Sequence, residues 1–141
     1  MKVTTKGRYG LRAILKLAEQ KDNKPLAISS IATDEQISPE FLEQIFYKMK
    51  KSGIIKSTRG PGGGFSIAKP VNEITLSDIL KSVGEPVMLS PCSTEETKDN
   101  CSRIENCPAY CIWQDVSEHL NEYFSSLTLE EIMKKGTSQN I

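Results

Sequence analysis

The chain has 141 residues, of which 38% are hydrophobic and 26% are charged, so it can bury an ordinary core without disulfide staples. Its 18 basic and 18 acidic side chains cancel overall but not along the chain. Residues 1–69 carry 13 Lys and Arg against 6 Asp and Glu, whereas residues 70–141 carry 5 against 12. A basic half is typical of a protein that binds a polyanion such as DNA. We expect the acidic half to stay away from DNA and to have a different role.

Charged residues interrupt the apolar residues of the first twenty positions, MKVTTKGRYGLRAILKLAEQ. This pattern fits neither a signal peptide nor a membrane span, and no later run reaches about 18 apolar residues. We therefore expect a cytoplasmic protein that makes no membrane contact. Thiols stay reduced in the cytoplasm, which disfavours two structural disulfides.

Apolar residues recur at helical spacing from residue 5 to residue 21, and turn residues 22–25 end the predicted helix. A short second helix follows, for which Ser29 or Ser30 offers an N-cap. A tight turn is expected near Gln36. These elements form the first part of a helical pair.

The second member of the pair has a strong start signal. Ser38 suits the N-cap and Pro39 suits the first helical position, where a missing N–H costs nothing. Gly53 ends the helix. Two short helices joined by a brief turn predict a helix-turn-helix. The apolar stripe of the second helix consists of Phe41, Leu42, Ile45, Phe46 and Met49.

A β-hairpin is predicted directly after this helix. Two β-prone segments, Ile54–Thr58 and Phe65–Ala68, flank the glycine-rich stretch at residues 59–64. A phosphate-binding loop would need Gly-Lys-Ser/Thr opening a helix, whereas a strand follows here. The hairpin is therefore read as the wing of a winged helix.

The C-terminal half predicts a short helix at Thr75–Val83, a polar loop, and a long helix opened by Pro108. The apolar seam of the long helix favours a dimer interface, with packing against its own winged helix as the alternative. That seam comprises Ile112, Val116, Leu120, Tyr123 and Leu127, widened by Trp113 and Phe124. The predicted fold is mainly α with a small β-hairpin wing. Its parts are a winged helix-turn-helix DNA-binding domain at 1–84, a cysteine-bearing sensor loop at 85–107, a dimerisation helix and short C-terminal helix at 108–135, and a loose tail at 136–141.

All four cysteines lie within twenty residues, at positions 92, 101, 107 and 111. Zinc sites commonly use two C-x₂₋₄-C pairs, and only Cys107 and Cys111 have that spacing here. Cysteines on a loop that ends at a helix start better suit a cluster that bridges irregular backbone. Cys107 also lies near a helix N-terminus, where the dipole favours a thiolate.

The residue strings KGRYGLRAILKLA, ISPEFLEQIFYKMKKSGIIKSTRGPGGGFSIAKP and CSRIENCPAYCIW together resemble a known family over nearly the whole chain. The chain is similar to the Rrf-two family of bacterial winged-helix regulators, and most closely to its IscR-like members, which sense iron–sulfur status. This resemblance implies a homodimer on a partly palindromic site in double-stranded DNA. Each recognition helix would enter a major groove, and each wing would reach the flanking backbone or minor groove.

The resemblance implies that Glu43 and Gln44 read bases. Their chemistry agrees with this role, since Gln can pair with adenine and Glu can accept a hydrogen bond from cytosine N4. Phe41 is a further candidate whose spacing also suits the core, and Glu40 stands where relatives often carry Ser. Arg59 at the wing tip suits phosphate or narrow minor-groove contact. The remaining candidates for the DNA interface, some of them merely solvated, are Ser38, Gly60, Lys2, Lys6, Arg8, Lys48, Lys50, Lys51 and Lys56.

The resemblance also implies a 2Fe–2S or 4Fe–4S cluster. Cys92, Cys101 and Cys107 match the family's three cysteine ligands, although the first gap is three residues longer than usual. Relatives place a His three residues after the third cysteine, and this chain has Tyr110 there. Cys111 is the nearest substitute, with packing in the dimer helix as its alternative role.

Other fourth ligands are disfavoured. The only histidine, His119, lies 12 residues beyond Cys107, or about 18 Å along a helix. The family's nitric-oxide sensors use an acidic residue near the N-terminus, and nothing acidic precedes Glu19.

The leading hypothesis is a transcriptional regulator whose DNA binding is modulated by an iron–sulfur cluster. Two alternatives stay open: a thiol-redox or zinc-switched repressor without a cluster, and a cysteine-metabolism repressor controlled by a protein partner. Family members of the last kind lack the cysteine cluster. The sequence offers one His, no nucleophile–base pair and no C-x-x-C, so we expect neither an enzyme nor a small-molecule substrate.

Overall fold

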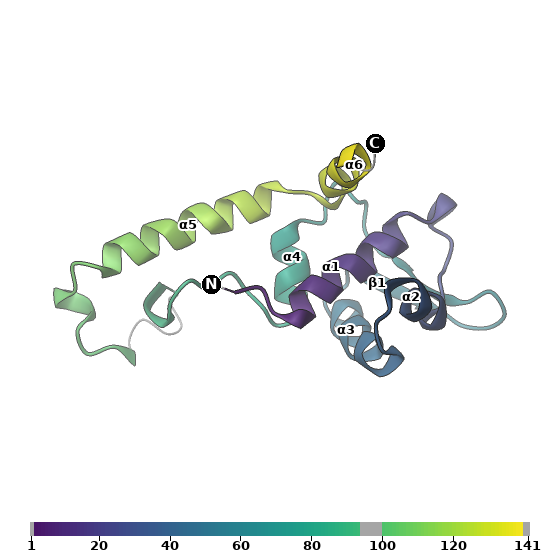
Figure 1. Ribbon diagram of the computed structural model, residues 1–141, viewed down its shortest axis with the longest axis horizontal. Coiled ribbons are helices and arrows are strands. Elements are labelled where there is room, and N and C mark those ends of the chain that lie inside the picture. Colours follow the sequence, from purple (N-terminus) through teal and green to yellow (C-terminus); the bar gives the residue numbers. More distant parts are fainter. Residues whose placement is uncertain (1, 94–99, 140–141) are drawn as a thin grey trace.

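Helix α1 (Thr5–Ala18) lies at the centre of the N-terminal half because its apolar residues line one face. Ala13, Ile14 and Leu17 on that face are at most 1% exposed. In the computed structural model, which describes residues 2–93 and 100–139, α1 packs against the helices that follow it (Figure 1). The winged-helix core therefore forms around the first helix of the chain.

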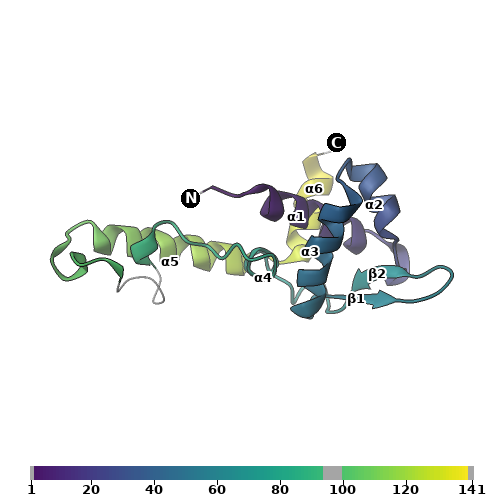
Figure 2. The same ribbon diagram turned by 90° about the horizontal axis from the view of Figure 1, so that it is seen from below.

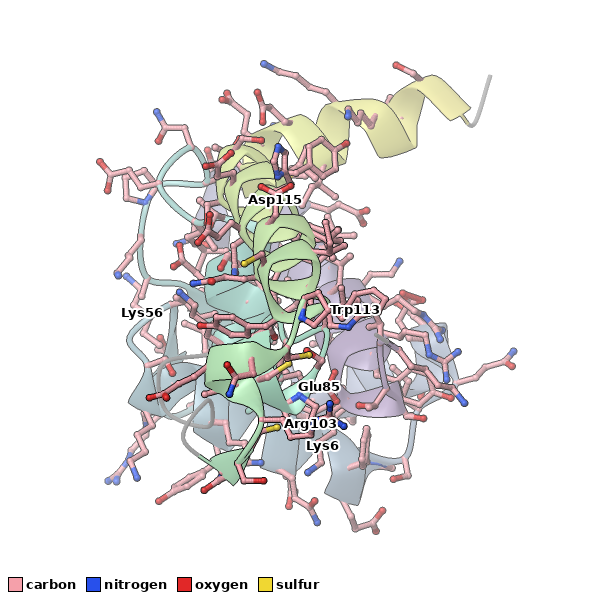
Figure 3. All side chains as sticks on the ribbon, turned by 90° about the vertical axis from the view of Figure 1, so that its left-hand side faces the viewer. Lys6, Lys56, Glu85, Arg103, Trp113 and Asp115 are labelled. Carbon is pink, nitrogen blue, oxygen red and sulfur yellow. The ribbon has the colours of Figure 1, made fainter. Side chains whose placement is uncertain are left out.

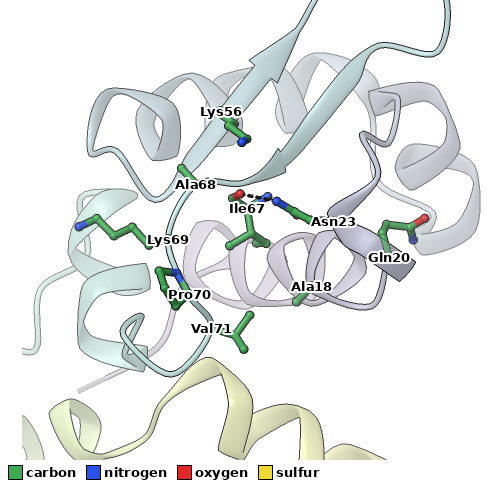
Figure 4. Close-up of a pocket in the computed structure, with 9 residues that line it drawn as sticks. All are labelled: Ala18, Gln20, Asn23, Lys56, Ile67, Ala68, Lys69, Pro70 and Val71. Atoms are coloured by element: carbon green, nitrogen blue, oxygen red, sulfur yellow. Dashed lines mark hydrogen bonds between the residues drawn. The ribbon is translucent and has the colours of Figure 1, made fainter.

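The end of α1 differs from the predicted boundary at residue 21. The helix ends at Ala18, and the 3-10 turn η1 (Lys21–Asn23) follows with a positive φ of 52° at Asn23. The Asn23 side-chain amide donates to the Ile67 carbonyl at 2.8 Å, and its oxygen accepts from the Ile67 N–H at 3.0 Å (Figure 4). This link to a distant strand draws the chain out of the helix.

Helix α2 (Ile28–Glu35) forms the first part of the helix-turn-helix. The predicted serine cap is wrong: Ala27 occupies the N-cap without a side-chain hydrogen bond. Leu26 and Phe65 exchange two backbone hydrogen bonds of 2.9 Å, which hold the preceding backbone extended and start the helix earlier. Gln36 adopts the left-handed conformation at φ 55°, which confirms the predicted turn.

Helix α3 (Pro39–Lys51) confirms both of its predicted end signals. The Ser38 hydroxyl accepts a hydrogen bond of 3.2 Å from the Phe41 N–H, and Gly53 has φ 81° just beyond the helix. Of the predicted apolar stripe, Phe41 is only partly buried. The fully buried members are Leu42, Ile45, Phe46 and Met49.

The wing consists of β1 (Ile55–Thr58) and β2 (Gly64–Ile67), which pair antiparallel from Ile55↔Ile67 to Thr58↔Gly64. The hairpin extends away from the helices (Figure 2). At Gly64, which has φ 148°, an added Cβ would lie 2.4 Å from the Leu26 carbonyl oxygen. Only glycine fits where the wing passes this close to the backbone before α2. The predicted mainly helical fold with one hairpin is confirmed.

Helices α4 (Leu76–Ser82) and α6 (Leu129–Gln139) begin side by side, although they are far apart in sequence. The Leu76 N–H donates to the Leu127 carbonyl at 2.8 Å, and the Leu129 N–H donates to the Ile74 carbonyl at 2.7 Å. Leu129 is fully buried in the core. The start of α6 is thus part of the winged-helix core, whereas the sequence pattern placed it with the dimerisation segment.

Each of these helices has a capping box. The Thr75 hydroxyl accepts from the Asp78 N–H while the Asp78 carboxylate accepts from the Thr75 N–H, at 3.1 and 3.0 Å. Thr128 and Glu131 repeat this arrangement at 3.2 and 3.1 Å. Helix α6 continues to Gln139, so the loose tail predicted from residue 136 is wrong for residues 136–139.

Helix α5 (Tyr110–Ser126) extends away from the other helices and packs against α4 near its C-terminal end (Figure 1). It begins two residues later than Pro108 predicted, because a turn from the Cys107 carbonyl to the Tyr110 N–H comes first. Proline suits either such a turn or a first helical position, so its presence alone does not fix the boundary. None of the described helices is long and apolar enough to cross a bilayer.

Candidate nucleic-acid interface and thiol segment

The exposed face of α3 carries a strip of polar side chains. Glu40, Glu43 and Gln44 from the predicted set line one shallow depression of about 410 Å³ together with Lys48. Tyr47 is the fifth residue of this strip and is 67% exposed. The sequence reading did not single it out, although its position opposite the buried stripe of the helix was available from helical periodicity.

Two predicted contact residues also have structural roles. The Ser38 hydroxyl caps α3, as described above, so its lone pair is engaged. Phe41 packs edge to face on Tyr9, with ring centroids 5.8 Å apart, and contacts the core. Phe41 therefore fixes α3 against α1, which supports the core reading of its spacing.

The predicted basic residues divide by position. Lys6 and Lys48 lie with Gln44 around one small hollow between α1 and α3. Lys2 lines a separate hollow beside Gly84. Arg8 hydrogen-bonds to the Thr5 hydroxyl at 3.3 Å. Lys48 thus belongs to the polar strip, Lys6 lies beside it, and Lys51 is exposed at the C-terminal end of α3.

The wing tip presents Arg59 and Gly60 to solvent. Gly60 has φ 93° and Gly62 has φ 74°, conformations that glycine adopts without strain. The tip is closed by a 2.9 Å hydrogen bond from the Gly63 N–H to the Gly60 carbonyl. The closed tip leaves Arg59 exposed to solvent, where a partner can reach its side chain.

Arg12 is a positioning residue that the sequence reading missed. Its guanidinium donates to the Glu35 carbonyl at the end of α2, lies 3.8 Å from the Glu35 carboxylate, and stands over the Tyr9 ring at 5.2 Å. It therefore fixes the turn before α3 against α1. An arginine inside an amphipathic helix gives no such signal in the sequence.

The four cysteines are free thiols and lie outside the core. Cys92 is partly buried in the turn η2 (Pro91–Ser93), which packs against α5, and its sulfur lies 3.1 Å from the Ser90 hydroxyl. Cys107 is partly buried just before α5, whereas Cys111 is exposed in the first turn of that helix. Cys101 is exposed ahead of the turn η4 (Ile104–Asn106).

The type and number of these donors fit an iron–sulfur cluster, because clusters are commonly held by four thiolates. Among residues 2–93 and 100–139, however, no three Cys, His, Asp or Glu side chains gather closely enough to hold a metal ion. His119 is no part of the set, since its Nδ1 lies 2.8 Å from the Asp115 carbonyl on the exposed middle of α5. Tyr110 is half-buried at the position where the family resemblance implies a histidine.

The projecting part of α5 exposes large apolar side chains. Ile112, Trp113, Val116 and Tyr123 are 58%, 45%, 39% and 53% exposed, respectively. In the view along α5, the Trp113 side chain projects from one side of the helix (Figure 3). At about 100° per residue, all four side chains fall within roughly a third of the helix circumference. Four of the seven predicted seam residues thus form an exposed apolar stripe, and the other three, Leu120, Phe124 and Leu127, are partly buried.

Comparison with known proteins gives a family match over most of the chain. The model of the Rrf2 family, described as an iron-dependent transcriptional regulator, matches residues 3–135. A helix-turn-helix-type transcriptional regulator of Haemophilus influenzae is 35% identical over 96% of this chain and 88% of its own length. The regulator IscR of Xenorhabdus nematophila is 32% identical over 95% of this chain and 80% of its own length.

Solved structures of similar proteins share the fold. The global cysteine regulator CymR of B. subtilis superposes with a TM-score of 0.77 at 28% identity, over 96% of this chain and 98% of that one. IscR of T. potens superposes with a TM-score of 0.76 at 28% identity, over all of this chain and 92% of that one. The fold is therefore shared by the cysteine regulator CymR and by IscR.

Proposed function

The chain belongs to the Rrf2 family of transcriptional regulators, and we propose that it is a homodimer whose affinity for double-stranded DNA changes with an iron–sulfur cluster held by Cys92, Cys101, Cys107 and Cys111. As a member of this family it is a DNA-binding regulator and not an enzyme. The observation that carries the proposal is that all four cysteines, each a free thiol, lie within residues 92–111, before and at the start of α5. We propose that it acts on DNA in the cytoplasm.

The DNA-binding part of the proposal rests on α3 and the wing. In a helix-turn-helix the second helix enters the major groove and its exposed side chains meet base edges. Glu43 and Gln44 occupy that exposed face, and Lys6 and Lys48 flank it where phosphates would run. Arg59 at the wing tip would add a contact to the flanking backbone or minor groove.

The dimer part rests on the apolar stripe of α5. A stripe of four large apolar side chains on a projecting helix costs free energy in water unless a partner covers it. A second copy of α5 offers the same stripe, so two copies can cover each other around a two-fold axis. That symmetry would present two recognition helices to the two halves of a partly palindromic site.

The positions of the thiols support a coupling between these two parts. Cys92 lies in the turn that packs on α5, and Cys107 and Cys111 flank the start of that helix. Helix α5 packs on α4, which in turn packs on α1 and α3. When bound, the cluster would supply sensitivity to iron and oxidants, and the thiols would join the sensor segment to the dimer helix. A coupling of about 1–3 kcal/mol between cluster binding and DNA binding would suffice for regulation.

The test is anaerobic purification followed by visible spectroscopy and iron and sulfide analysis. The wild type is expected to be coloured and to change its affinity for a selected DNA duplex when the cluster is removed. Cys111→Ala should lose the cluster if Cys111 is the fourth ligand, whereas Tyr110→Phe should retain it. A colourless protein with stoichiometric zinc would overturn the cluster and favour a zinc-switched repressor.

A second candidate is a cysteine-responsive regulator, which is favoured by the superposition on CymR, a cysteine regulator, over 96% of this chain. That function would need no cluster. The two candidates separate in the same experiment, because a protein that stays colourless after reconstitution with iron and sulfide, yet binds DNA fully, would fit only the second candidate or a direct thiol switch.

A further inference from the structure

Tyr47 lies on the exposed face of α3, among the polar side chains of the strip described above. At about 100° per residue, it lies roughly 40° around the helix from Glu43 and 60° from Gln44, between the two predicted base readers. The buried side chains of α3 point almost diametrically away from it. These are Leu42, Ile45, Phe46 and Met49.

Nothing in the described structure employs the Tyr47 side chain. The ring is 67% exposed and makes no aromatic contact with another described ring, and its hydroxyl has no hydrogen-bond partner among the described residues. Neighbouring Phe46, by contrast, is fully buried and packs against the Phe65 ring in a tilted arrangement, with ring centroids 5.0 Å apart. Tyr47 is therefore available to a partner of α3.

The charges around Tyr47 decide which part of DNA it would meet. Glu40 and Glu43 line the same depression, and their carboxylates repel phosphates. The centre of the strip must therefore face base edges, while Lys48 lies about 100° round from Tyr47 toward one wall of the groove. An aromatic ring at the centre of a recognition strip suits an apolar contact with the thymine methyl group.

We propose that Tyr47 is a specificity-determining residue that reads the methyl group of one thymine in each half-site through its ring. Tyr47 lies four residues beyond Glu43, or about 6 Å along the helix axis. Since base pairs are stacked about 3.4 Å apart, the thymine lies roughly two base pairs from the pair that Glu43 contacts. This inference rests on the proposed DNA-binding function of α3.

The experiment selects a preferred site from a random pool of duplexes with the wild-type protein. Each thymine of that site is then replaced by deoxyuridine, which removes only the methyl group. Deoxyuridine at one position should lower the affinity of the wild type and of Tyr47→Phe by about fourfold per half-site. This is the effect of removing one buried methyl group. Tyr47→Ala should bind the thymine and deoxyuridine duplexes equally.

Three results would overturn the inference. Tyr47→Ala could keep the thymine preference, which would exclude the ring. Tyr47→Phe could lose the thymine preference as Tyr47→Ala does, which would mean that the Tyr47 hydroxyl, in contact with a phosphate, acts in place of the ring. If the wild type selected no sequence at all, the proposed DNA-binding function would fail together with the role of Tyr47. Because Tyr47 is a surface residue, both variants should fold, and their far-ultraviolet circular dichroism checks this.

Discussion

We propose that Glu43 supplies base selectivity without affinity. Its carboxylate lies on the exposed face of α3, would repel phosphates, and would be satisfied in the groove by a donor such as cytosine N4. We predict that Glu43→Ala relaxes base preference at one position of a selected site without a general loss of affinity. Comparison of selected sequences for the two proteins measures this. Glu19→Ala, which removes an exposed acid at the end of α1, is the matched control for the change in net charge. A uniform fall in affinity for all sequences would contradict base readout.

His119 lies in surroundings that raise its pKa. A hydrogen bond to the Asp115 carbonyl, and then the nearby Asp115 carboxylate, raise its pKa above the ordinary 6.5, with smaller contributions from Glu122 and Glu118. Because the folded state favours the protonated ring, the resulting stabilisation is full below pH 6.5 and is lost as the pH rises through the raised pKa.

An NMR titration of the His119 ring protons should therefore give a pKa above 6.5 in the wild type. Asp115→Asn should lower this pKa only in part, because the larger contribution comes from the backbone carbonyl and remains. A pKa in Asp115→Asn at or below the ordinary value would show that the backbone hydrogen bond is not formed in solution.

At the scale of elements, the wing is expected to act through charge alone. Arg59→Ala should weaken binding to all sequences by a similar factor and reduce the slope of log affinity against log salt concentration by about one. Filter binding or fluorescence anisotropy at several salt concentrations measures the slope. Arg103→Ala, which removes an exposed arginine from the sensor segment, should leave it unchanged. An unchanged slope in Arg59→Ala would rule out the proposed phosphate contact.

Helix α6 is expected to stabilise the winged helix because its first residue fills the core. Leu129 is fully buried, so Leu129→Ala should lower the free energy of unfolding by about 2–5 kcal/mol. Urea denaturation at a fixed protein concentration measures this. Lys135→Ala on the exposed side of the same helix should change the stability by less than about 0.5 kcal/mol. Equal midpoints for the two variants would mean that α6 does not dock in solution.

At the scale of the whole molecule, the stripe on α5 is expected to set the oligomeric state. Ile112→Glu places a charge within the stripe and should yield a monomer in sedimentation velocity runs at micromolar concentration. Its affinity for a two-part DNA site should then fall to that for a half-site. Ser125→Glu adds the same charge on another side of the helix and should leave a dimer. If Ile112→Glu remained a dimer, the dimer interface would lie outside the α5 stripe.

The elements whose signals are local could be predicted from the amino-acid sequence alone. The Ser38 cap, the Gln36 turn, the Thr75 capping box and the glycine-rich wing each depend on hydrogen bonds or φ angles within a few residues. Composition likewise identified the basic half and the four thiols, since these need no knowledge of contacts. Such features can be read in order along the chain.

Features that depend on partners far away in the sequence became visible only in the folded chain. The early end of α1 follows from hydrogen bonds between Asn23 and Ile67, which are 44 residues apart in sequence. The docking of α6 follows from backbone pairing of Thr75 with Thr128, and the role of Arg12 follows from its contact with Glu35. Local periodicity carries no information about such partners. The propensities that form a helix are the same whether its end docks on the core or extends into solvent.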